Sequence, residues 1–308
     1  MLTRRHTLLA PLAAPLAAVL PAAATAAPPF PVAYAGSMGA LMDKGIGPAF
    51  GAAEHVSFQG IGRGAFALAR LIAAKQMVVN SFIPITAGPF AIVHKAGLAA
   101  TAVPVASTQM CLPYSPKSPH AKLFAAVAAG KAPLVPALLT PGLRFGRTDP
   151  RTDPQGRNIL FTVKLAELYY KAPGLGAKLL GPAINPAEIF TEPSLLARLE
   201  AGQIDIASGY LSAVHSQRLP YIPLPAEINL GDAAMAGTWY DRARMAVPGP
   251  HGMVTAAPQP LLFYAMTLAN APDPKAAAAF LGFLTGPKGK ALFARFGYSP
   301  PSGPTLGA

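Results

Sequence analysis

The sequence predicts an α/β fold with mostly parallel sheets. Short apolar stretches typical of strands alternate along the chain with segments whose apolar residues recur at helical spacing. The chain has 308 residues, of which 52% are hydrophobic and 12% charged, which is enough for one large domain or two lobes with sizeable cores. It contains no internal repeat and no low-complexity linker.

The first half of the chain supplies strands and helices in alternation. Gly36 ends the first strand, and Ser37 has the side chain typical of a helix start. Asp153-Pro154 also precedes a helix, as a good N-cap followed by proline in the first turn. The predicted strands are 30–36, 77–84, 91–97 and 110–116, and the predicted helices are 37–51, 62–76, 120–131 and 158–171.

The second half continues the alternation. A short helix is predicted at 193–203, and a buried strand follows it at 204–212. Near the end, a strand at 260–269 precedes two helices within 273–297. Gly286-Pro287 separates these two helices, because proline cannot continue a helix.

The first 27 residues have the anatomy of a secretory signal peptide. Arg4 and Arg5 precede an apolar stretch that proline interrupts, and an A-x-A cleavage pattern follows at 24–26. We therefore expect an exported, periplasmic protein, with Sec and twin-arginine export both open. The single cysteine, Cys111, excludes an intramolecular disulfide and is expected to be a small buried side chain.

Charge and motifs narrow the class of function. The formal net charge is +12, but the basic residues are scattered singly and are not interleaved with aromatic residues. This argues against nucleic-acid binding and leaves small anions as partners. The six histidines show no metal-ligand spacing, and the sequence has no G-x-S-x-G elbow and no phosphate-binding loop. Asp149 and Asp153 could do acid–base work, but their proline neighbours favour turns. We expect no enzyme and no cofactor.

Hydroxyl groups at predicted strand ends are the candidate ligand-binding groups. Ser37 begins a helix directly after a strand, where unpaired N–H groups favour an anion, although the motif alone favours an ordinary N-cap. Ser81, Ser107 and Thr108 lie near the ends of other strands. Because ligands of open α/β sheets bind at the carboxyl ends of strands, these hydroxyls could converge on one crevice.

Several blocks of sequence carry a resemblance to a known family. The blocks are "YAGS", "FGRTDPRTDPQGRNILFTVKLAELYY", "EPSLLARLEAGQIDIASGYLSAV", "LPYIPLPAEINLGD" and the C-terminal "FYAMTLANAPDPKAAAAFLGFLTGPKGKALFARFGY". In these blocks the chain resembles the periplasmic molybdate/tungstate-binding proteins of ABC transporters, especially the branch typical of archaeal tungstate binders. The resemblance implies a two-lobed periplasmic binding protein of type II, a Venus flytrap with two hinge crossings. On that basis we expect lobe I at 28–109 plus 255–308 and lobe II at 110–254.

The resemblance also implies a set of ligand-binding residues. The matching positions are Ser37, Ser81, Ser107 or Thr108, Asp153, Glu192 and Tyr210. In the archaeal branch two carboxylates, here Asp153 and Glu192, reach the bound molybdenum or tungsten. A carboxylate beside a dianion is repelled unless its oxygen bonds the metal itself, so the pair would favour molybdate or tungstate. The chain departs from the family at Gln155 and at Arg157, where the family has cysteine and an aromatic residue.

These observations predict the solute-binding component of an ABC importer. The expected partners are a small oxyanion, a membrane permease and its ATPase, and the protein is expected to act as a monomer. The alternatives are a receptor for sulfate, thiosulfate or a small carboxylate, and a cell-envelope binding or scaffold domain. Convergence of Ser37, Ser81, Ser107 and Asp153 in one cleft would favour the receptor, whereas scattered positions would favour the scaffold.

Overall fold

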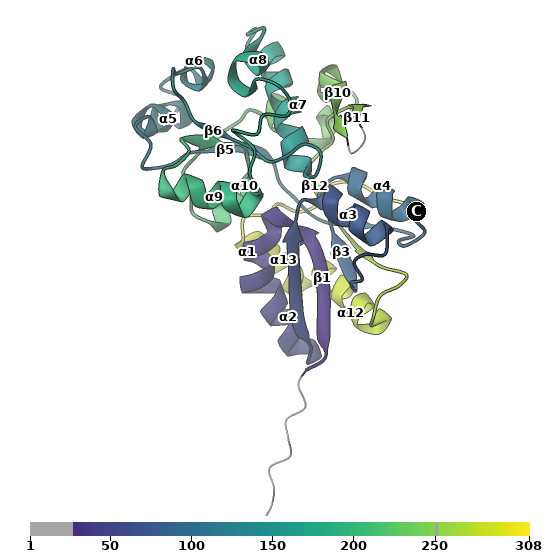
Figure 1. Ribbon diagram of the computed structural model, residues 1–308. Helices are drawn as coiled ribbons and strands as arrows, with labels where there is room; N and C mark the ends of the chain where they lie inside the picture. Colours follow the sequence, from purple (N-terminus) through teal and green to yellow (C-terminus); the bar gives the residue numbers. More distant parts are fainter. Residues whose placement is uncertain (1–26, 250–251) are drawn as a thin grey trace, which may run out of the picture.

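The computed structural model describes residues 27–249 and 252–308. The chain forms two α/β lobes, one above the other in Figure 1, which confirms the two-lobed fold class. The predicted signal peptide lies outside the described residues except for its last position, Ala27. Among the described residues, no helix combines the length and the apolar character needed to cross a membrane.

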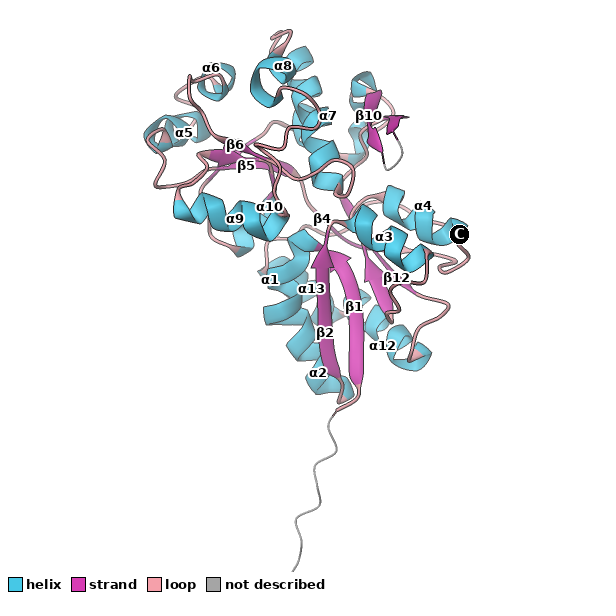
Figure 2. Cartoon of the chain, in the orientation of Figure 1, coloured by secondary structure: helices cyan, strands magenta, loops and turns pink. Residues whose placement is uncertain are grey.

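Lobe I is built on a five-stranded sheet with helices on both faces (Figure 2). Three aromatic rings form the centre of its core on one face, with Phe50 4.8 Å from Phe280 and 5.1 Å from Phe30 between ring centroids. The elements are β1 (Pro29–Ala35), η1 (Gly36–Met38), α1 (Gly39–Leu41), η2 (Met42–Ile46), α2 (Gly47–Glu54), β2 (Ser57–Arg63), α3 (Ala65–Ala73), β3 (Ser81–Ile83), α4 (Ala87–Lys95), β4 (Val103–Ser107), β12 (Leu262–Thr267), α12 (Pro274–Thr285) and α13 (Pro287–Arg295).

The strand order of this sheet is β2-β1-β3-β12-β4. β1 pairs in parallel with both β2 and β3, whereas β12 is antiparallel to β3 and β4. β12 runs the other way because the chain returns from lobe II and enters the sheet at the edge that faces that lobe. The carboxyl ends of β1, β2, β3 and β4 therefore all face lobe II.

Lobe II has smaller sheets around a central helix, α7. β5 is antiparallel to β8 and β9, and β6 pairs in parallel with β7, so this lobe departs from the mostly parallel sheets expected. The elements are β5 (Met110–Pro113), α5 (Ala121–Ala128), α6 (Leu134–Leu138), β6 (Phe145–Gly146), α7 (Pro154–Tyr169), α8 (Leu175–Leu180), α9 (Glu192–Ala201), β7 (Ile206–Ala207), β8 (Gly209–Tyr210), α10 (Leu211–Ser216), β9 (Tyr221–Pro223), α11 (Ala226–Asn229), η3 (Ala233–Met235), η4 (Tyr240–Ala243), β10 (Met245–Gly249) and β11 (Gly252–Ala256).

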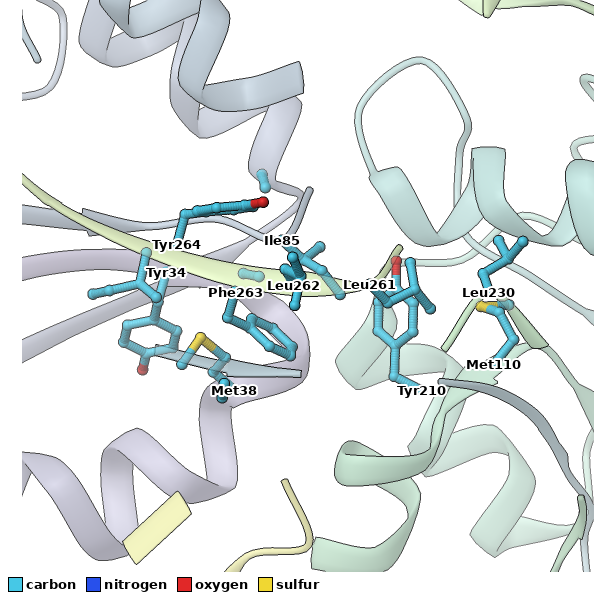
Figure 3. Close-up of a cluster of buried hydrophobic side chains, with 14 of the residues drawn as sticks. Tyr34, Met38, Ile85, Met110, Tyr210, Leu230, Leu261, Leu262, Phe263 and Tyr264 are labelled. Carbon is cyan, nitrogen blue, oxygen red and sulfur yellow. The ribbon is translucent and has the colours of Figure 1, made fainter. Parts of the chain in front are cut away.

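Two crossings join the lobes, one between β4 and β5 and one between β11 and β12. The crossings are hydrogen-bonded to each other, because the N–H of Thr108 donates to the carbonyl of Leu261 at 3.0 Å. Figure 3 shows that buried side chains continue along the second crossing, from Phe263 in lobe I past Leu261 to Tyr210 in lobe II. Strand β11 ends at Ala256, two residues beyond the predicted end of lobe II at residue 254. The exact lobe boundaries stay a prediction.

Two predicted strands differ from the structure, and one observed strand was not predicted. The range 91–97, expected as a strand, begins inside helix α4, whose buried Phe90 and Val93 are spaced as on one helix face. A short apolar run does not by itself distinguish a strand from a buried helix segment. The strand expected at 204–212 is interrupted at Ser208 and gives way to α10 at Leu211. β2 was not predicted, since only Phe58 and Ile61 among its residues are bulky apolar side chains.

Candidate ligand-binding site between the lobes

A cavity of about 630 Å³ lies between the lobes. Lobe I lines it with the carboxyl ends of β1 and β2, where ligands of open α/β sheets are expected. Lobe II lines it with the loop before α7 and with the start of α9. The lining residues are Gly36, Gly62, Arg63, Gly64, Ala67, Thr148, Asp149, Thr152, Asp153, Ile189, Phe190, Thr191, Glu192 and Pro193.

The lobes touch each other beside this cavity. Ala35 at the end of β1 lies opposite Arg63 at the end of β2, so both strands stop at the same edge. The N–H of Ala67 donates across the interface to the carbonyl of Thr152 at 3.2 Å. A Cβ atom on Gly64 would lie 2.6 Å from the same carbonyl oxygen. The absence of a side chain at Gly64 is therefore what allows lobe II to approach this closely.

Ser37 is buried with an unpaired hydroxyl. It lies in the short helix η1, whose N-cap is Ala35, so Ser37 is not the N-cap that the motif allowed. Its Oγ has no hydrogen-bond partner among the described residues, while its carbonyl accepts a hydrogen bond from the hydroxyl of Tyr298 at 3.1 Å. A buried hydroxyl without a partner is costly. Ser37 itself is not among the residues that line the cavity, but the preceding residue, Gly36, is.

Asp153 caps helix α7 and lines the cavity at the same time. Its Oδ1 accepts a hydrogen bond from the N–H of Gln155 at 3.0 Å, and Pro154 occupies the first helical position, as the sequence predicted. The side chain is buried, with only 8% of Asp153 exposed. Capping uses Oδ1, which leaves the second carboxyl oxygen for the cavity.

Glu192 is the first residue of helix α9, and Gln155 orients it. The side-chain amide of Gln155 donates to Oε1 of Glu192 at 3.2 Å, and the hydroxyl of Ser208 donates to the amide oxygen of Gln155 at 3.2 Å. These two bonds fix which end of the amide faces Glu192. The other oxygen, Oε2, lies 3.2 Å from where a Cβ on Gly36 would be. Glu192 therefore faces the first loop of lobe I.

The two carboxyl groups are buried together without a basic partner. Burial raises the pKa of Asp153 to about 6. Burial and then the charge of Asp153 raise the pKa of Glu192 well above its usual range. No lysine or arginine among the described residues forms an ion pair with either side chain. The pair suits a ligand that brings a positive centre or hydrogen-bond donors to it.

Tyr210 lies within electrostatic reach of this pair. It is almost fully buried, and its hydroxyl accepts a hydrogen bond from the amide of Asn158 at 2.9 Å. Burial and then the charge of Asp153 raise its pKa far above the usual range. The hydroxyl of Tyr210 therefore keeps its proton. Tyr210 is not among the residues that line the cavity.

The structure does not bring Ser81 to the cavity. Ser81 is the first residue of β3 and lies opposite Val32, three positions before the end of β1. At the usual rise of a strand, this places it about 10 Å from the carboxyl edge of the sheet. The predicted strand 77–84 put Ser81 near its end, whereas the observed strand only begins there.

Ser107 and Thr108 lie at the first crossing, where both hydroxyls have structural partners. The hydroxyl of Ser107 donates to the carbonyl of Pro300 at 2.7 Å. The hydroxyl oxygen of Thr108 accepts a hydrogen bond from the N–H of Ser212 at 3.1 Å. Neither residue lines the cavity, and both hold the hinge region in place.

Sequence reasoning also missed several residues of the cavity. Arg63 and Gly64 line it because the unpredicted strand β2 ends there, and no motif marked Thr148 or Thr191. Arg157, which could have paired with Asp153, instead donates from Nε to the carbonyl of Pro150 at 2.9 Å. The Asp153 carboxyl thus stays directed to the cavity and the helix cap.

Comparison with known proteins relates this chain to solute-binding proteins. A family model described as bacterial extracellular solute-binding protein matches residues 30–299. A solute-binding protein of Petrotoga mobilis, itself uncharacterized, is 38% identical over 172 residues, 54% of this chain and 53% of that protein. The molybdate/tungstate-binding protein WtpA of Pyrococcus abyssi is 32% identical over 169 residues, 48% of each chain. The matches thus span about half the length of these curated relatives.

A solved structure has the same fold. The periplasmic molybdate-binding protein of Azotobacter vinelandii aligns with 89% of this chain and 100% of its own length, with a TM-score of 0.59 and 14% identity. The match to the family model covers nearly all of the described residues. This chain therefore belongs to the family of bacterial extracellular solute-binding proteins.

Proposed function

We propose that this chain is the periplasmic solute-binding component of an ABC importer and captures molybdate or tungstate between its lobes. One observation carries the proposal: Asp153 and Glu192 are buried together beside the interlobe cavity, with Gln155 holding both and no basic partner among the described residues. The similarity to a molybdate/tungstate-binding protein supports the same ligand. The site binds its solute and transforms nothing.

The chemistry of the carboxyl pair favours a metal oxyanion. Two ionised carboxylates repel a dianion strongly in a buried site, unless their oxygens bond the central atom. The high-valent metal of molybdate or tungstate accepts such hard oxygen ligands, whereas the sulfur of sulfate offers no open coordination position. The hydroxyls of Ser37 and Tyr210, together with the N–H groups at the start of η1, would then donate to the oxo groups.

The raised pKa values support one alternative ligand class. When Asp153 and Glu192 hold protons, they can donate hydrogen bonds to sulfate, thiosulfate or a small carboxylate. The two modes respond oppositely to pH. Coordination of a metal needs ionised carboxylates and strengthens as the pH rises through about 6, whereas binding of sulfate by protonated carboxyls weakens over the same interval.

Capture and delivery follow from the two-lobed architecture. The open form takes up the anion at the helix starts of one lobe, and closure removes it from water. The closed shape then docks on a membrane permease that an ATPase drives, so the ligand acts by shifting the population of closed molecules. Export by the N-terminal signal peptide places the monomeric protein in the periplasm, where the anion arrives.

A pair of matched serine variants tests the site. Ser37 and Ser81 are both buried in lobe I, and their hydroxyls have no partner among the described residues, but only Ser37 directly follows a residue that lines the cavity, Gly36. We expect Ser37→Ala to lower tungstate affinity about ten-fold or more, because a hydrogen bond to a charged ligand is lost, and Ser81→Ala to leave it unchanged. Equilibrium dialysis with metal analysis measures both. Equal affinities in the two variants would contradict the proposed site.

A further inference from the structure

A second, smaller cavity of about 130 Å³ also lies between the lobes. Helix α7 of lobe II lines it with Arg157, lobe I lines it with Phe66 and Thr86, and the second crossing lines it with Gln259. None of these residues lines the larger cavity, so the two are separate spaces at one interface.

Arg157 brings a positive charge to this small cavity, and no carboxylate within the described ranges of the chain forms an ion pair with it. Its guanidinium carbon lies 4.1 Å from the centre of the Phe66 ring, so the contact joins the two lobes. Only Nε has a hydrogen-bond partner in the described part of the chain, the carbonyl of Pro150. Burial and then the charge of Arg70 lower the pKa of Arg157. The cation is thus partly removed from water without a counter-charge.

Two arginines from opposite lobes lie within electrostatic reach of each other at this interface. Arg70 belongs to α3 of lobe I, and it donates across the interface to the carbonyl of Arg151 at 3.3 Å. Arg157 belongs to α7 of lobe II. Because like charges at a partly buried interface repel, their proximity opposes closure unless an anion neutralises Arg157.

The other polar groups of the small cavity can also donate hydrogen bonds. The side-chain oxygen of Gln259 accepts from the N–H of Ala87 at 3.3 Å, which leaves its NH₂ group free to face the cavity. Thr86 is 7% exposed and forms no side-chain hydrogen bond within residues 27–249 and 252–308. It directly precedes α4, a nine-residue helix whose first turn presents N–H groups. Asn158 also lines the cavity, but its amide nitrogen is bound to Tyr210.

We propose that this second cavity binds a small monovalent anion, of the size of chloride or nitrate, which neutralises Arg157 and favours the closed form. The volume of about 130 Å³ fits such an anion with a few waters, since one water occupies about 30 Å³ in the liquid. Residues of both lobes and of the crossing surround the space, so an anion held there stabilises their closed arrangement. The main ligand then binds more tightly in its presence.

Thermal unfolding of the ligand-free protein tests this second site. Wild type is compared in chloride, nitrate and gluconate at one ionic strength, because gluconate is too large for the cavity. We expect chloride and nitrate to raise the unfolding midpoint by about 2–4 °C over gluconate. Arg157→Gln should abolish this difference. Arg242→Gln should keep it, since Arg242 also stacks on an aromatic ring, Trp239 at 4.3 Å, but is not among the residues that line the cavity.

Equal midpoints of wild type in the three salts would overturn the proposal, as would a full chloride response in Arg157→Gln. If Arg157→Gln does not fold, chloride NMR of the wild-type protein decides. Broadening of the chloride signal that added nitrate reverses supports the site, and the absence of such broadening overturns it.

The coupling between the two sites is measured as the affinity for tungstate, which is expected to be several-fold higher in chloride than in gluconate. A wild type that shows the salt response but binds no tungstate contradicts the proposed function and leaves the second site standing.

Discussion

Asp153 shows how one residue can serve structure and ligand at once. One carboxyl oxygen caps α7, and the side chain also lines the larger cavity beside Glu192. No basic side chain in the described part of the chain pairs with Asp153, so its burial is costly without a ligand, because an ionised carboxylate loses its hydration there. Such a cost is tolerated where a ligand later supplies the missing partner.

The pH dependence of stability reports this cost. The pKa of Asp153 is raised from 3.8 to about 6, so the folded ligand-free state holds its proton more readily than the unfolded chain. The protonated Asp153 side chain therefore stabilises the folded state. This stabilisation is complete below the pKa of Asp153 in the unfolded chain, and it is lost as the pH rises through the pKa of Asp153 in the folded protein. Relative to Asp153→Asn, which keeps the helix cap, we expect wild type to lose roughly 3 kcal/mol between about pH 4 and pH 8. Urea unfolding at a series of pH values measures the difference, and a flat or rising difference would disagree with this assignment.

At the scale of elements, Arg147 positions the segment that leads into α9. The side chain is fully buried and donates to the carbonyls of Ala183 and Pro182, both at 2.8 Å, and to Glu188 at 3.2 Å. The backbone of Arg147 also pairs with this segment, since its carbonyl accepts from the N–H of Phe190 at 2.9 Å. Arg147 therefore fixes residues 182–190, the segment that leads to Glu192 at the start of α9.

Replacing Arg147 should destabilise the protein through the segment that leads into α9. We expect Arg147→Met to lower the free energy of unfolding by about 3–5 kcal/mol, because the buried carbonyls and Glu188 lose their partner. Arg151→Met is the matched control: its side chain is 51% exposed and pairs with Asp149, so its loss should cost about 1 kcal/mol or less. Urea denaturation compares the two variants. A similar cost for both would show that Arg147 has no special positioning role.

Elements with clear local signals could be predicted, and those without them could not. Helix α7 has a capping Asp153 and a proline at its first position, and α12 and α13 meet at Gly286-Pro287, so their existence follows from local chemistry. β2 and α4 carry no such signals, and tertiary pairing decides their form: β2 becomes a strand by pairing along the whole of β1.

At the scale of the whole molecule, close contact between the lobes depends on Gly64. Its backbone, with φ −54° and ψ 121°, is open to any residue, so glycine is not needed there for conformation. What requires glycine is the carbonyl of Thr152 on lobe II, 2.6 Å from a hypothetical Cβ. A side chain at this position would act on the closed arrangement and leave each lobe intact.

Gly64→Ala should therefore impair closure without impairing folding. We expect tungstate affinity to fall about ten-fold or more and the ligand-induced decrease in radius of gyration to disappear, while the unfolding midpoint in the absence of ligand changes little. Gly39→Ala is the control, because nothing lies within 4 Å of a Cβ there. Small-angle scattering with and without tungstate measures closure. Normal compaction of Gly64→Ala would refute this role of the glycine.

The candidate site could be predicted in part from the sequence. Ser37 and Asp153 belong to helix starts that local motifs mark, whereas Glu192 was implied by the family resemblance. The structure places all three at the facing edges of the lobes. Ser81, Ser107 and Thr108 were expected as hydroxyls near strand ends, but β3 begins at Ser81 and the other two hydroxyls bind the hinge. Which strand ends converge is a property of sheet register, and single-sequence patterns do not contain it.

The most direct test is calorimetric titration of residues 28–308 with tungstate, molybdate and sulfate at about pH 7.5. The account predicts saturable one-site binding of tungstate and molybdate, much weaker binding of sulfate, and loss of the binding heat in Glu192→Gln. Tight binding of sulfate alone, or no heat from any of the three anions, would contradict the proposal that the buried carboxyl pair receives a metal oxyanion.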